Sequence, residues 1–210
     1  MEIRLFLVED HPVVLAGVRA FVDDSEFVIV GEALNAIEAV ERAPRAEPQL
    51  LLMDVRLPGP DGLECLGRLR KAGVSAPALV YSGYENPTYV ARAMALGASG
   101  FLLKSVSRGE LLSAMRTTAA GQTCWSRDEV RRLTGALAAP RVEDDIEAPL
   151  TRRENEVLKQ LAFGLTNKEI AQALGISYET VKEHVQHILR KVGANDRTQA
   201  AVWAVRRGLV

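Results

Sequence analysis

Cysteines, aromatic residues and long apolar runs are all scarce in this sequence, and each scarcity narrows the class of protein. The two cysteines, Cys65 and Cys124, lie far apart without metal-binding spacing, so we expect reduced thiols in a cytoplasmic protein. No apolar run approaches the roughly 18–20 residues of a membrane helix, and the short run at 3–8 ends in acids, unlike a signal peptide. Aromatic residues are 5% of the chain but hydrophobic residues are 48%, which indicates an ordinary globular protein.

The charge is unevenly divided along the 210 residues, a length that suits two small domains. Residues 1–149 hold 16 Lys or Arg and 21 Asp or Glu, a net charge of −5, whereas residues 150–210 hold 10 and 6, a net charge of +4. A basic segment attracts polyanions, so the tail is a candidate for nucleic-acid binding. Charge alone does not separate this interpretation from an ordinary solvated surface.

The first 120 residues alternate short apolar runs with amphipathic stretches. The apolar runs are rich in Val, Leu, Ile and Phe and too short for helices, so they predict strands. The predicted strands span 3–8, 27–33, 49–54, 77–82 and 100–104, and the predicted helices span 12–23, 35–44, 61–72, 86–96 and 107–120. This alternation predicts an α/β fold with a parallel sheet covered on both faces, in which ligands bind beyond the carboxyl ends of the strands.

Polar side chains follow the predicted strands at that edge. Glu9 and Asp10 follow the first strand and Asp54 ends the third, while Ser82 and Lys104 end the fourth and fifth. Singly, each is more often a solvated, turn or surface residue, but together at the same ends of successive strands they indicate a site. Three clustered carboxylates repel one another and require a cation, and a set of oxygen ligands favours Mg²⁺.

Asp54 is the candidate nucleophile, because a carboxylate is able to attack a phosphoryl group and form an aspartyl phosphate. Mg²⁺ and the Lys104 ammonium would offset charge on the transferring group, and the Ser82 hydroxyl would hydrogen-bond its oxygens afterwards. The Pro- and Gly-rich loop after Asp54 lets the backbone pass close to the site, where the carbonyl of Arg56 is expected to complete the metal shell. His11, beside the acids, is interpreted as a loop residue.

These motifs resemble the receiver domain of response regulators. The matching segments are VEDHP, MDVRLPGPDG, VYSGY and GFLLKS, and their order and spacing agree with that family. The resemblance implies a flavodoxin-like (βα)5 fold and phosphotransfer from a sensor histidine kinase to Asp54. It also implies that Mg²⁺ is held by Glu9, Asp10 and Asp54, and that Ser82 and Phe101 move together as a switch.

The chain changes character after the predicted receiver domain at residues 1–120. The span 121–149 contains a stretch of small and acidic residues bracketed by Pro140 and Pro149. This composition predicts that the span is a linker that lets two domains reorient. Residues 150–210 then form the predicted second domain.

The second domain is predicted to be all helical, with helices at 151–163, 167–174, 178–192 and 196–208. Capping-box pairs occur at Thr151 with Glu154 and at Thr166 with Glu169. The central helices are joined by Gly175-Ile176-Ser177, the short glycine turn of a helix-turn-helix. Ala171 is small where these two helices cross, and Val181 is expected to pack beneath it.

The third predicted helix has one apolar face and one polar face. The apolar stripe consists of Val181, Val185, Ile188, Leu189 and Val192. The polar face, which also carries Arg190, would enter the major groove, where Lys182 suits guanine, Gln186 adenine and Glu183 cytosine. Phosphate contacts are expected from Thr166, Lys168, Tyr178, Thr180, His184 and Lys191. The alternative, a helix whose charges are only solvated, is disfavoured by the preceding helix, the glycine turn and the net charge.

Residues 150–210 resemble the LuxR-type helix-turn-helix in LTRRENEVL, GLTNKEIAQALGIS and TVKEHVQHILRKVG. Together with the receiver motifs, this resemblance identifies the chain as a member of the NarL/FixJ family of transcriptional regulators. It implies a homodimer on a twofold site in double-stranded DNA, and a resting receiver that covers the recognition helix. The dimer contact would be made by the last helix, through Ala200, Ala201, Trp203, Ala204 and Val205.

Two other functions remain as alternatives. The first is a DNA-binding protein that is never phosphorylated, which the intact set of acids, Ser82 and Lys104 disfavours. The second is a phosphatase that uses Asp54. Such hydrolases commonly have a second acid two residues later as proton donor, whereas this chain has Arg56, so we do not expect an enzyme.

Overall fold

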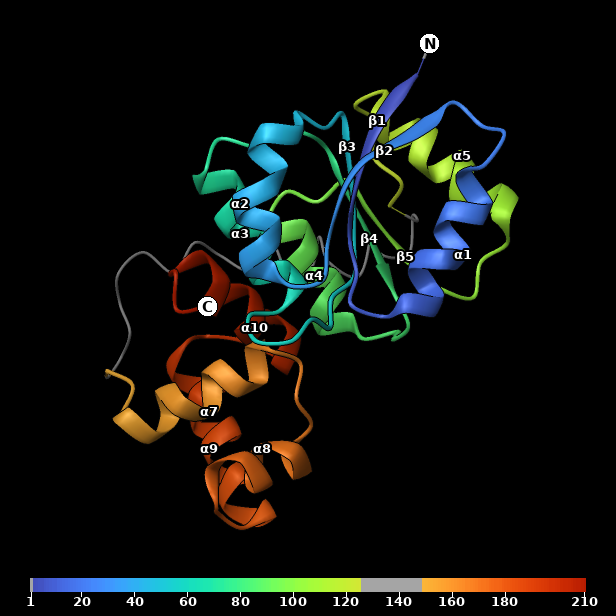
Figure 1. Ribbon diagram of the computed structural model, residues 1–210. Helices are drawn as coiled ribbons and strands as arrows, with labels where there is room; N and C mark the ends of the chain where they lie inside the picture. Colours follow the sequence, from blue (N-terminus) through green and yellow to red (C-terminus); the bar gives the residue numbers. More distant parts are fainter. Residues whose placement is uncertain (1, 126–148) are drawn as a thin grey trace. The chain divides into compact units, whose positions relative to one another are not determined.

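The computed structural model describes residues 2–125 and 149–210, which form two compact units (Figure 1). One unit holds residues up to Glu85 together with Leu96–Trp125, and the other groups Asn86–Ala95 with the C-terminal helices. Most of the predicted linker lies outside the described residues. No helix in the described part of the chain is long and apolar enough to cross a bilayer.

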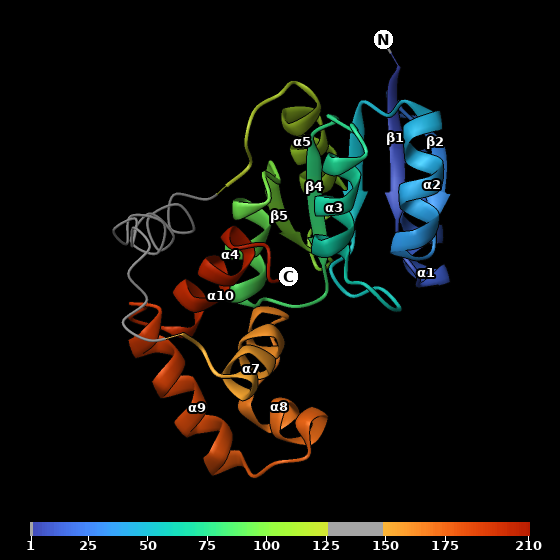
Figure 2. The same ribbon diagram turned by 90° about the vertical axis from the view of Figure 1, so that its left-hand side faces the viewer.

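The first unit contains a five-stranded sheet in the order β2-β1-β3-β4-β5, and every neighbouring pair is parallel (Figure 2). The strands are β1 (Ile3–Val8), β2 (Phe27–Ala33), β3 (Leu50–Met53), β4 (Ala78–Ser82) and β5 (Gly100–Leu103). This order is that of flavodoxin-like sheets, with the topological switch between β1 and β3. The prediction of a flavodoxin-like parallel sheet is therefore confirmed, and the ligand-binding crevice is expected where β1 and β3 end.

Helices cover both faces of this sheet. The helices of this unit are α1 (Pro12–Val22), α2 (Ala36–Ala46), α3 (Gly62–Lys71) and α5 (Arg108–Ala119), while α4 (Pro87–Ala95) belongs to the other unit. The helices α1 and α5 lie on one side and α2 and α3 on the other (Figure 1). Beneath α1 and α5, Leu5, Leu52 and Leu79 from the strands pack with Leu15 and Met115 from the helices.

Side-chain caps set the starts of three of these helices. Asn35, Asp61 and Ser107 each accept a hydrogen bond from the backbone N–H three residues later, which satisfies one of the free donors at a helix start. Each such contact is local in sequence, so capping residues mark boundaries well. The observed helix and strand ends accordingly differ from the predicted ones by at most two residues.

The described residues 149–210 form four helices, as predicted. They are α7 (Arg152–Ala162), α8 (Asn167–Leu174), α9 (Tyr178–Lys191) and α10 (Arg197–Arg206). Both predicted capping boxes form, at Thr151 and at Thr166. The helices enclose an apolar cluster that includes Leu158, Ile170 and Ile188.

A buried ion pair crosses this helical cluster. Glu154 is only 3% exposed, and its Oε2 lies 2.7 Å from the Lys191 ammonium and 2.7 Å from the backbone nitrogen of Thr151. Burial raises the pKa of Glu154, but the hydrogen bonds from Lys191 and Thr151 outweigh burial and lower the pKa from 4.5 to about 2. The ionised carboxylate therefore stabilises the folded state.

The stability that Glu154 contributes should depend on pH. A pKa lowered from 4.5 to about 2 gives about 3 kcal/mol of folding free energy, fully present above about pH 4.5 and lost as the pH falls towards 2. Glu154→Gln should thus cost about 3 kcal/mol at pH 7 and about half of that at pH 3. Urea unfolding followed by Trp203 fluorescence, with Trp125 replaced by Phe, measures the difference.

The matched control is Glu156→Gln on the same helix. The Glu156 side chain is 35% exposed and pairs with Arg152 and Arg153, so its loss should cost far less than the loss of Glu154, because solvent screens exposed ion pairs. A cost of Glu154→Gln that is the same at pH 7 and pH 3 would show that ionisation of Glu154 does not stabilise the fold.

Candidate functional site

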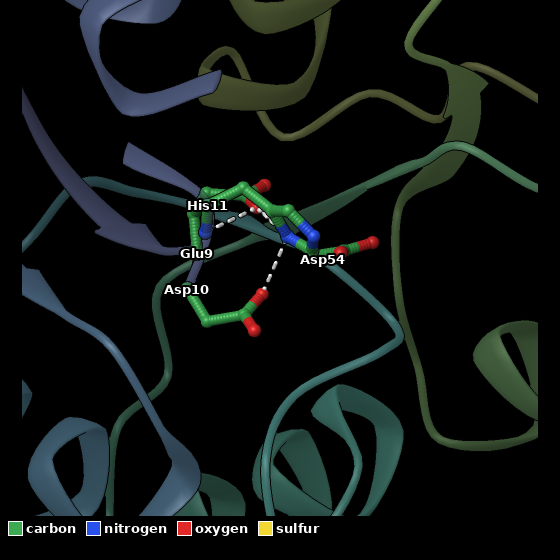
Figure 3. A group of neighbouring side chains, drawn as sticks. All are labelled: Glu9, Asp10, His11 and Asp54. Carbon is green, nitrogen blue, oxygen red and sulfur yellow. Dashed lines mark hydrogen bonds and ion pairs between the residues drawn. The ribbon is translucent and has the colours of Figure 1, made fainter. Parts of the chain in front are cut away.

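The carboxyl ends of the strands bring the predicted acidic residues together. Glu9 and Asp10 directly follow β1 and Asp54 directly follows β3, and one ligand atom of each lies within 4.8 Å of the others and of a His11 nitrogen (Figure 3). Lys104 directly follows β5, and its ammonium lies 2.7 Å from Glu9 Oε2 and 3.0 Å from Asp54 Oδ2. Glu9, Asp10, Asp54 and Lys104, which were predicted at the carboxyl edge of the sheet, therefore lie close together there.

The ion pairs explain why a buried strand ends in a carboxylate. Asp54 and Glu9 are only 4% and 5% exposed, and burying such charges without a partner costs several kcal/mol. Burial by itself lowers the pKa of Lys104, but its hydrogen bonds to Glu9 and Asp54 outweigh burial and raise that pKa. Lys104 is therefore a firmly charged cation held between two buried carboxylates.

The loop after Asp54 brings the first turn of α3 against the site. The backbone N–H of Val55 donates to Asp54 Oδ1 at 2.7 Å, and the N–H of Gly62 donates to the Val55 carbonyl at 2.8 Å. A Cβ atom added to Gly62 would lie 1.7 Å from the Asp54 carbonyl oxygen. Only glycine permits this close approach, so the loop and the position of Asp54 depend on residue 62.

Replacing Gly62 with alanine should therefore destabilise the protein by about 3 kcal/mol or more, because the backbone on one side of the contact must move. Gly67→Ala is the matched control in the same helix. Its Cβ would meet only Leu96 at an ordinary 3.6 Å, so the change should stabilise the helix by about 0.5–1 kcal/mol. Thermal or urea unfolding of both variants measures these effects, and equal effects of the two would contradict the close approach.

Ser82 and Phe101 are both buried. Ser82 has no exposed surface, and its hydroxyl accepts a hydrogen bond from the Tyr84 N–H at 3.2 Å. The backbone N–H of Lys104 donates to the Ser82 carbonyl at 2.8 Å, which ties the end of β5 to the end of β4. The Arg56 guanidinium lies over the Tyr84 ring at 4.1 Å, whereas the expected role of the Arg56 carbonyl stays a prediction.

The donor set fits a divalent cation such as Mg²⁺. Glu9, Asp10 and Asp54 offer only oxygen atoms, which is the ligand type that Mg²⁺ prefers. Asp10 Oδ1 is enclosed and, within residues 2–125 and 149–210, accepts no hydrogen bond of good geometry, although the His11 imidazole lies 2.8 Å away. An enclosed carboxylate oxygen that accepts no well-formed hydrogen bond is suited to coordinate a cation, because buried polar atoms normally find a partner.

His11 has a place in the site that the sequence analysis did not give it. The imidazole Nδ1 lies 2.8 Å from Asp10 Oδ1 and 3.3 Å from Glu9 Oε1 (Figure 3). The interpretation of His11 as an ordinary loop residue was therefore incomplete. Its position next to two acids at a strand end was the available signal.

The second candidate surface is the helix-turn-helix of α8 and α9. The joining residue Gly175 has φ of +64°, a left-handed conformation that glycine adopts without strain. Ala171 and Val181 are buried in the same cluster, as predicted for the helix crossing. The predicted base-reading face of α9 is exposed at Lys182, Glu183, Gln186 and Arg190.

Most predicted phosphate contacts also lie at or near the surface. Thr166, Lys168 and Tyr178 are exposed, and Thr180, His184 and Lys191 are partly exposed. Three of these side chains already have partners. Thr166 caps α8, Thr180 shares a hydrogen bond with the Ser177 hydroxyl, and Lys191 pairs with the buried Glu154. A phosphate contact by Lys191 would thus compete with an internal ion pair.

The predicted dimer contact on α10 needs correction. Ala200, Ala201 and Ala204 have no exposed surface and belong to the apolar cluster of their own chain. Small apolar residues suit a helix interface and a core equally well, and here they pack in the core. Only Trp203 and Val205 of the predicted set are partly exposed.

Comparisons with known proteins match both parts of the chain to known families. The family model described as "Response regulator receiver domain" matches residues 5–116, and the one described as "Bacterial regulatory proteins, luxR family" matches residues 148–204. The nitrate/nitrite response regulator protein NarL of Escherichia coli (strain K12) is 38% identical over 202 residues, which cover 95% of this chain and 93% of NarL.

Solved structures of response regulators have a fold similar to that of this chain. The response regulator ChrA of a heme-sensing two-component system is 32% identical, with a TM-score of 0.52, and the match covers 100% of this chain and 99% of ChrA. A structure of the response regulator RcsB in complex with DNA has a TM-score of 0.61 at 23% identity, covering 97% of this chain and 98% of RcsB. At that identity, the likeness to RcsB concerns the fold alone.

Proposed function

Because this chain belongs to the response regulators that join a receiver domain to a LuxR-type DNA-binding domain, we propose that phosphorylation of Asp54 by a sensor histidine kinase controls its binding to DNA. The proposed domains are a receiver at 1–120, a linker at 121–149 and a DNA-binding domain at 150–210, in a cytoplasmic protein. The observation that carries the proposal is the contact of Lys104 with the buried Asp54 and Glu9 carboxylates.

In the proposed reaction, an Asp54 carboxylate oxygen attacks the phosphorus of a phosphohistidine. A phosphorus–oxygen bond forms, the phosphorus–nitrogen bond breaks, and the electron pair of that bond leaves with the imidazole. Lys104 lies 3.0 Å from Asp54 Oδ2, so its ammonium is positioned to offset charge on the phosphoryl oxygens. When bound, Mg²⁺ held by Glu9, Asp10, Asp54 and the Arg56 carbonyl supplies further positive charge at this point.

Phosphorylation would change the pairing of Lys104 and Ser82. The phosphoryl group adds roughly two negative charges and attracts the Lys104 ammonium away from Glu9. Ser82 has no exposed surface and ends β4, so its hydroxyl must reorient to donate to the phosphoryl group. Phe101 is buried on the neighbouring strand and would repack with it.

No single one of these contacts is large enough for a complete switch. One charge-assisted hydrogen bond is worth about 1.5–3 kcal/mol, whereas moving an equilibrium from 1:99 to 99:1 takes about 5.5 kcal/mol. The Lys104 pairing, the repacking of Phe101 and dimerisation on DNA must therefore act together with Ser82. We propose that they release the DNA-binding domain and favour a homodimer on a twofold DNA site.

The proposed DNA contact uses the exposed face of α9 in the major groove. Lys182, Gln186 and Glu183 are exposed side chains suited to guanine, adenine and cytosine, in that order. RcsB, which shares the fold, has been solved in complex with DNA. The side chains around this face, including Lys168 of α8, would hold the phosphates and fix the register.

Lys182→Ala should weaken specific DNA binding by about 1–3 kcal/mol and relax the base preference at one position of the site. Lys168→Ala should instead weaken binding to all sequences evenly and reduce the slope of log affinity against log salt by about 1. Fluorescence anisotropy with specific and random duplexes over a range of salt separates the two effects. If both variants lost affinity evenly on all duplexes, α9 would not be the base-reading helix.

Enzymatic turnover of outside substrates is not part of the proposal. The position two residues after Asp54, where hydrolases of this chemistry commonly have a second acid, is Arg56, whose side chain lies over Tyr84. Slow loss of the protein's own phosphate is expected and differs from metabolic catalysis. The competing interpretation, a receiver that is never phosphorylated, is tested by phosphate incorporation from acetyl phosphate with Mg²⁺.

A further inference from the structure

The ring of His11 faces the acidic cluster instead of capping the helix that it begins. His11 is the N-cap of α1, a position that favours side chains able to accept backbone hydrogen bonds, yet its ring makes no such bond. Its backbone N–H donates to Glu9 Oε1 at 3.1 Å, which anchors the residue to the cluster. The imidazole is 63% exposed, and Nδ1 is the atom turned towards the carboxylates.

The spacing of these atoms suits ligands of one ion. Two ligands in neighbouring positions, each about 2.1 Å from a divalent ion, are about 3.0–3.4 Å apart. The Nδ1 atom lies 2.8 Å from Asp10 Oδ1 and 3.3 Å from Glu9 Oε1, close to that separation. Asp10 Oδ1 is enclosed and accepts no hydrogen bond of good geometry in the part of the chain described, and His11 Nδ1 lies 2.8 Å from it, so the two atoms adjoin the same point.

We propose that His11 Nδ1 is a fourth side-chain ligand of the pocket, beside Glu9, Asp10 and Asp54. It would give the pocket affinity for Zn²⁺ and similar imidazole-binding ions, which compete with Mg²⁺ for the three carboxylates. Imidazole nitrogen suits Zn²⁺, whereas Mg²⁺ takes oxygen ligands, so His11 affects the two ions differently. This inference rests on the proposed function, because the carboxylates are those of the phosphorylation site. The competing role for His11 is a positioning one, in which Nδ1–H only donates to Asp10.

Calorimetric titration of the full chain with ZnCl₂ and, separately, MgCl₂ tests the proposal. In His11→Ala, the ratio of Zn²⁺ affinity to Mg²⁺ affinity should fall at least about tenfold, since one nitrogen ligand is lost. His187→Ala, at an exposed histidine of α9, is the matched control and should leave the ratio unchanged. A parallel loss of affinity for both ions in His11→Ala would overturn the proposal in favour of the positioning role.

A second measurement does not depend on how the variant folds. The chain has three histidines, so ¹⁵N-histidine labelling gives few resonances. Zn²⁺ should shift the Nδ1 resonance of His11 in the wild-type protein, whereas Mg²⁺ should not. A Zn²⁺ shift confined to His184 and His187 would overturn the proposal. Phosphate incorporation by the wild-type protein with Mg²⁺ is measured separately, and its absence would refute the proposed function without bearing on the Zn²⁺ shift.

Discussion

Replacing Lys104 with methionine should lower the free energy of unfolding of the metal-free receiver by about 3–5 kcal/mol. The Lys104 ammonium contacts Glu9 Oε2 and Asp54 Oδ2, and both acids are nearly inaccessible to solvent. Methionine keeps most of the length of the unbranched side chain but leaves two buried carboxylates facing each other without a cation. Urea unfolding in the presence of a metal chelator measures the loss.

Added Mg²⁺ should restore much of the stability of Lys104→Met, because a bound cation replaces the missing positive charge among the carboxylates. Lys71→Met, at an exposed lysine of α3, is the matched control and should change stability by less than about 0.5 kcal/mol with or without Mg²⁺. A loss in Lys104→Met that Mg²⁺ does not reduce would contradict the assignment of Glu9, Asp10 and Asp54 as the cation site.

Replacing Asp54 with asparagine should reduce phosphate incorporation from acetyl phosphate by at least about a hundredfold, because the amide is not a nucleophile. The measurement is the mass of the intact protein after incubation with acetyl phosphate and Mg²⁺. Asparagine has nearly the same shape, and Lys104 keeps its contact with Glu9 at 2.7 Å, so the variant should remain folded.

The control for this substitution is Asp23→Asn, at an exposed aspartate that follows α1. It should incorporate phosphate as the wild-type protein does. Persistent incorporation in Asp54→Asn would move the phosphoacceptor to another residue, and peptide mapping of the phosphorylated protein would then identify it.

The fold was largely predictable because its signals are local. The strands β1 and β2 begin and end where the apolar runs do, and the caps at Thr151 and Thr166 lie within four residues of their partners. The end of α2 was predicted less accurately than the ends of β1 and β2. A helix was expected to stop at Pro44, but the observed helix continues to Ala46 with Pro44 inside it.

For the candidate site, the sequence predicted which strand ends carry the functional residues. Parallel strands bring their carboxyl ends to one edge of the sheet, and this rule alone predicts that Glu9, Asp54 and Lys104 lie close together. The pairing of Glu154 with Lys191 was not predictable, because 37 residues separate the two and only packing brings them together. In the same way, sequence alone does not tell whether the small residues of α10 face a partner or the chain's own core.

The central claim is that the chemical state of Asp54 sets the affinity for DNA. Its most direct test is the dissociation constant, at one salt concentration, for a duplex enriched from a random pool by the phosphorylated protein. With acetyl phosphate and Mg²⁺, the wild-type protein should bind at least about tenfold more tightly than without, a coupling of about 1.4 kcal/mol, and Asp54→Asn should not change. An equal gain in Asp54→Asn, or no gain in fully phosphorylated wild-type protein, would contradict the account.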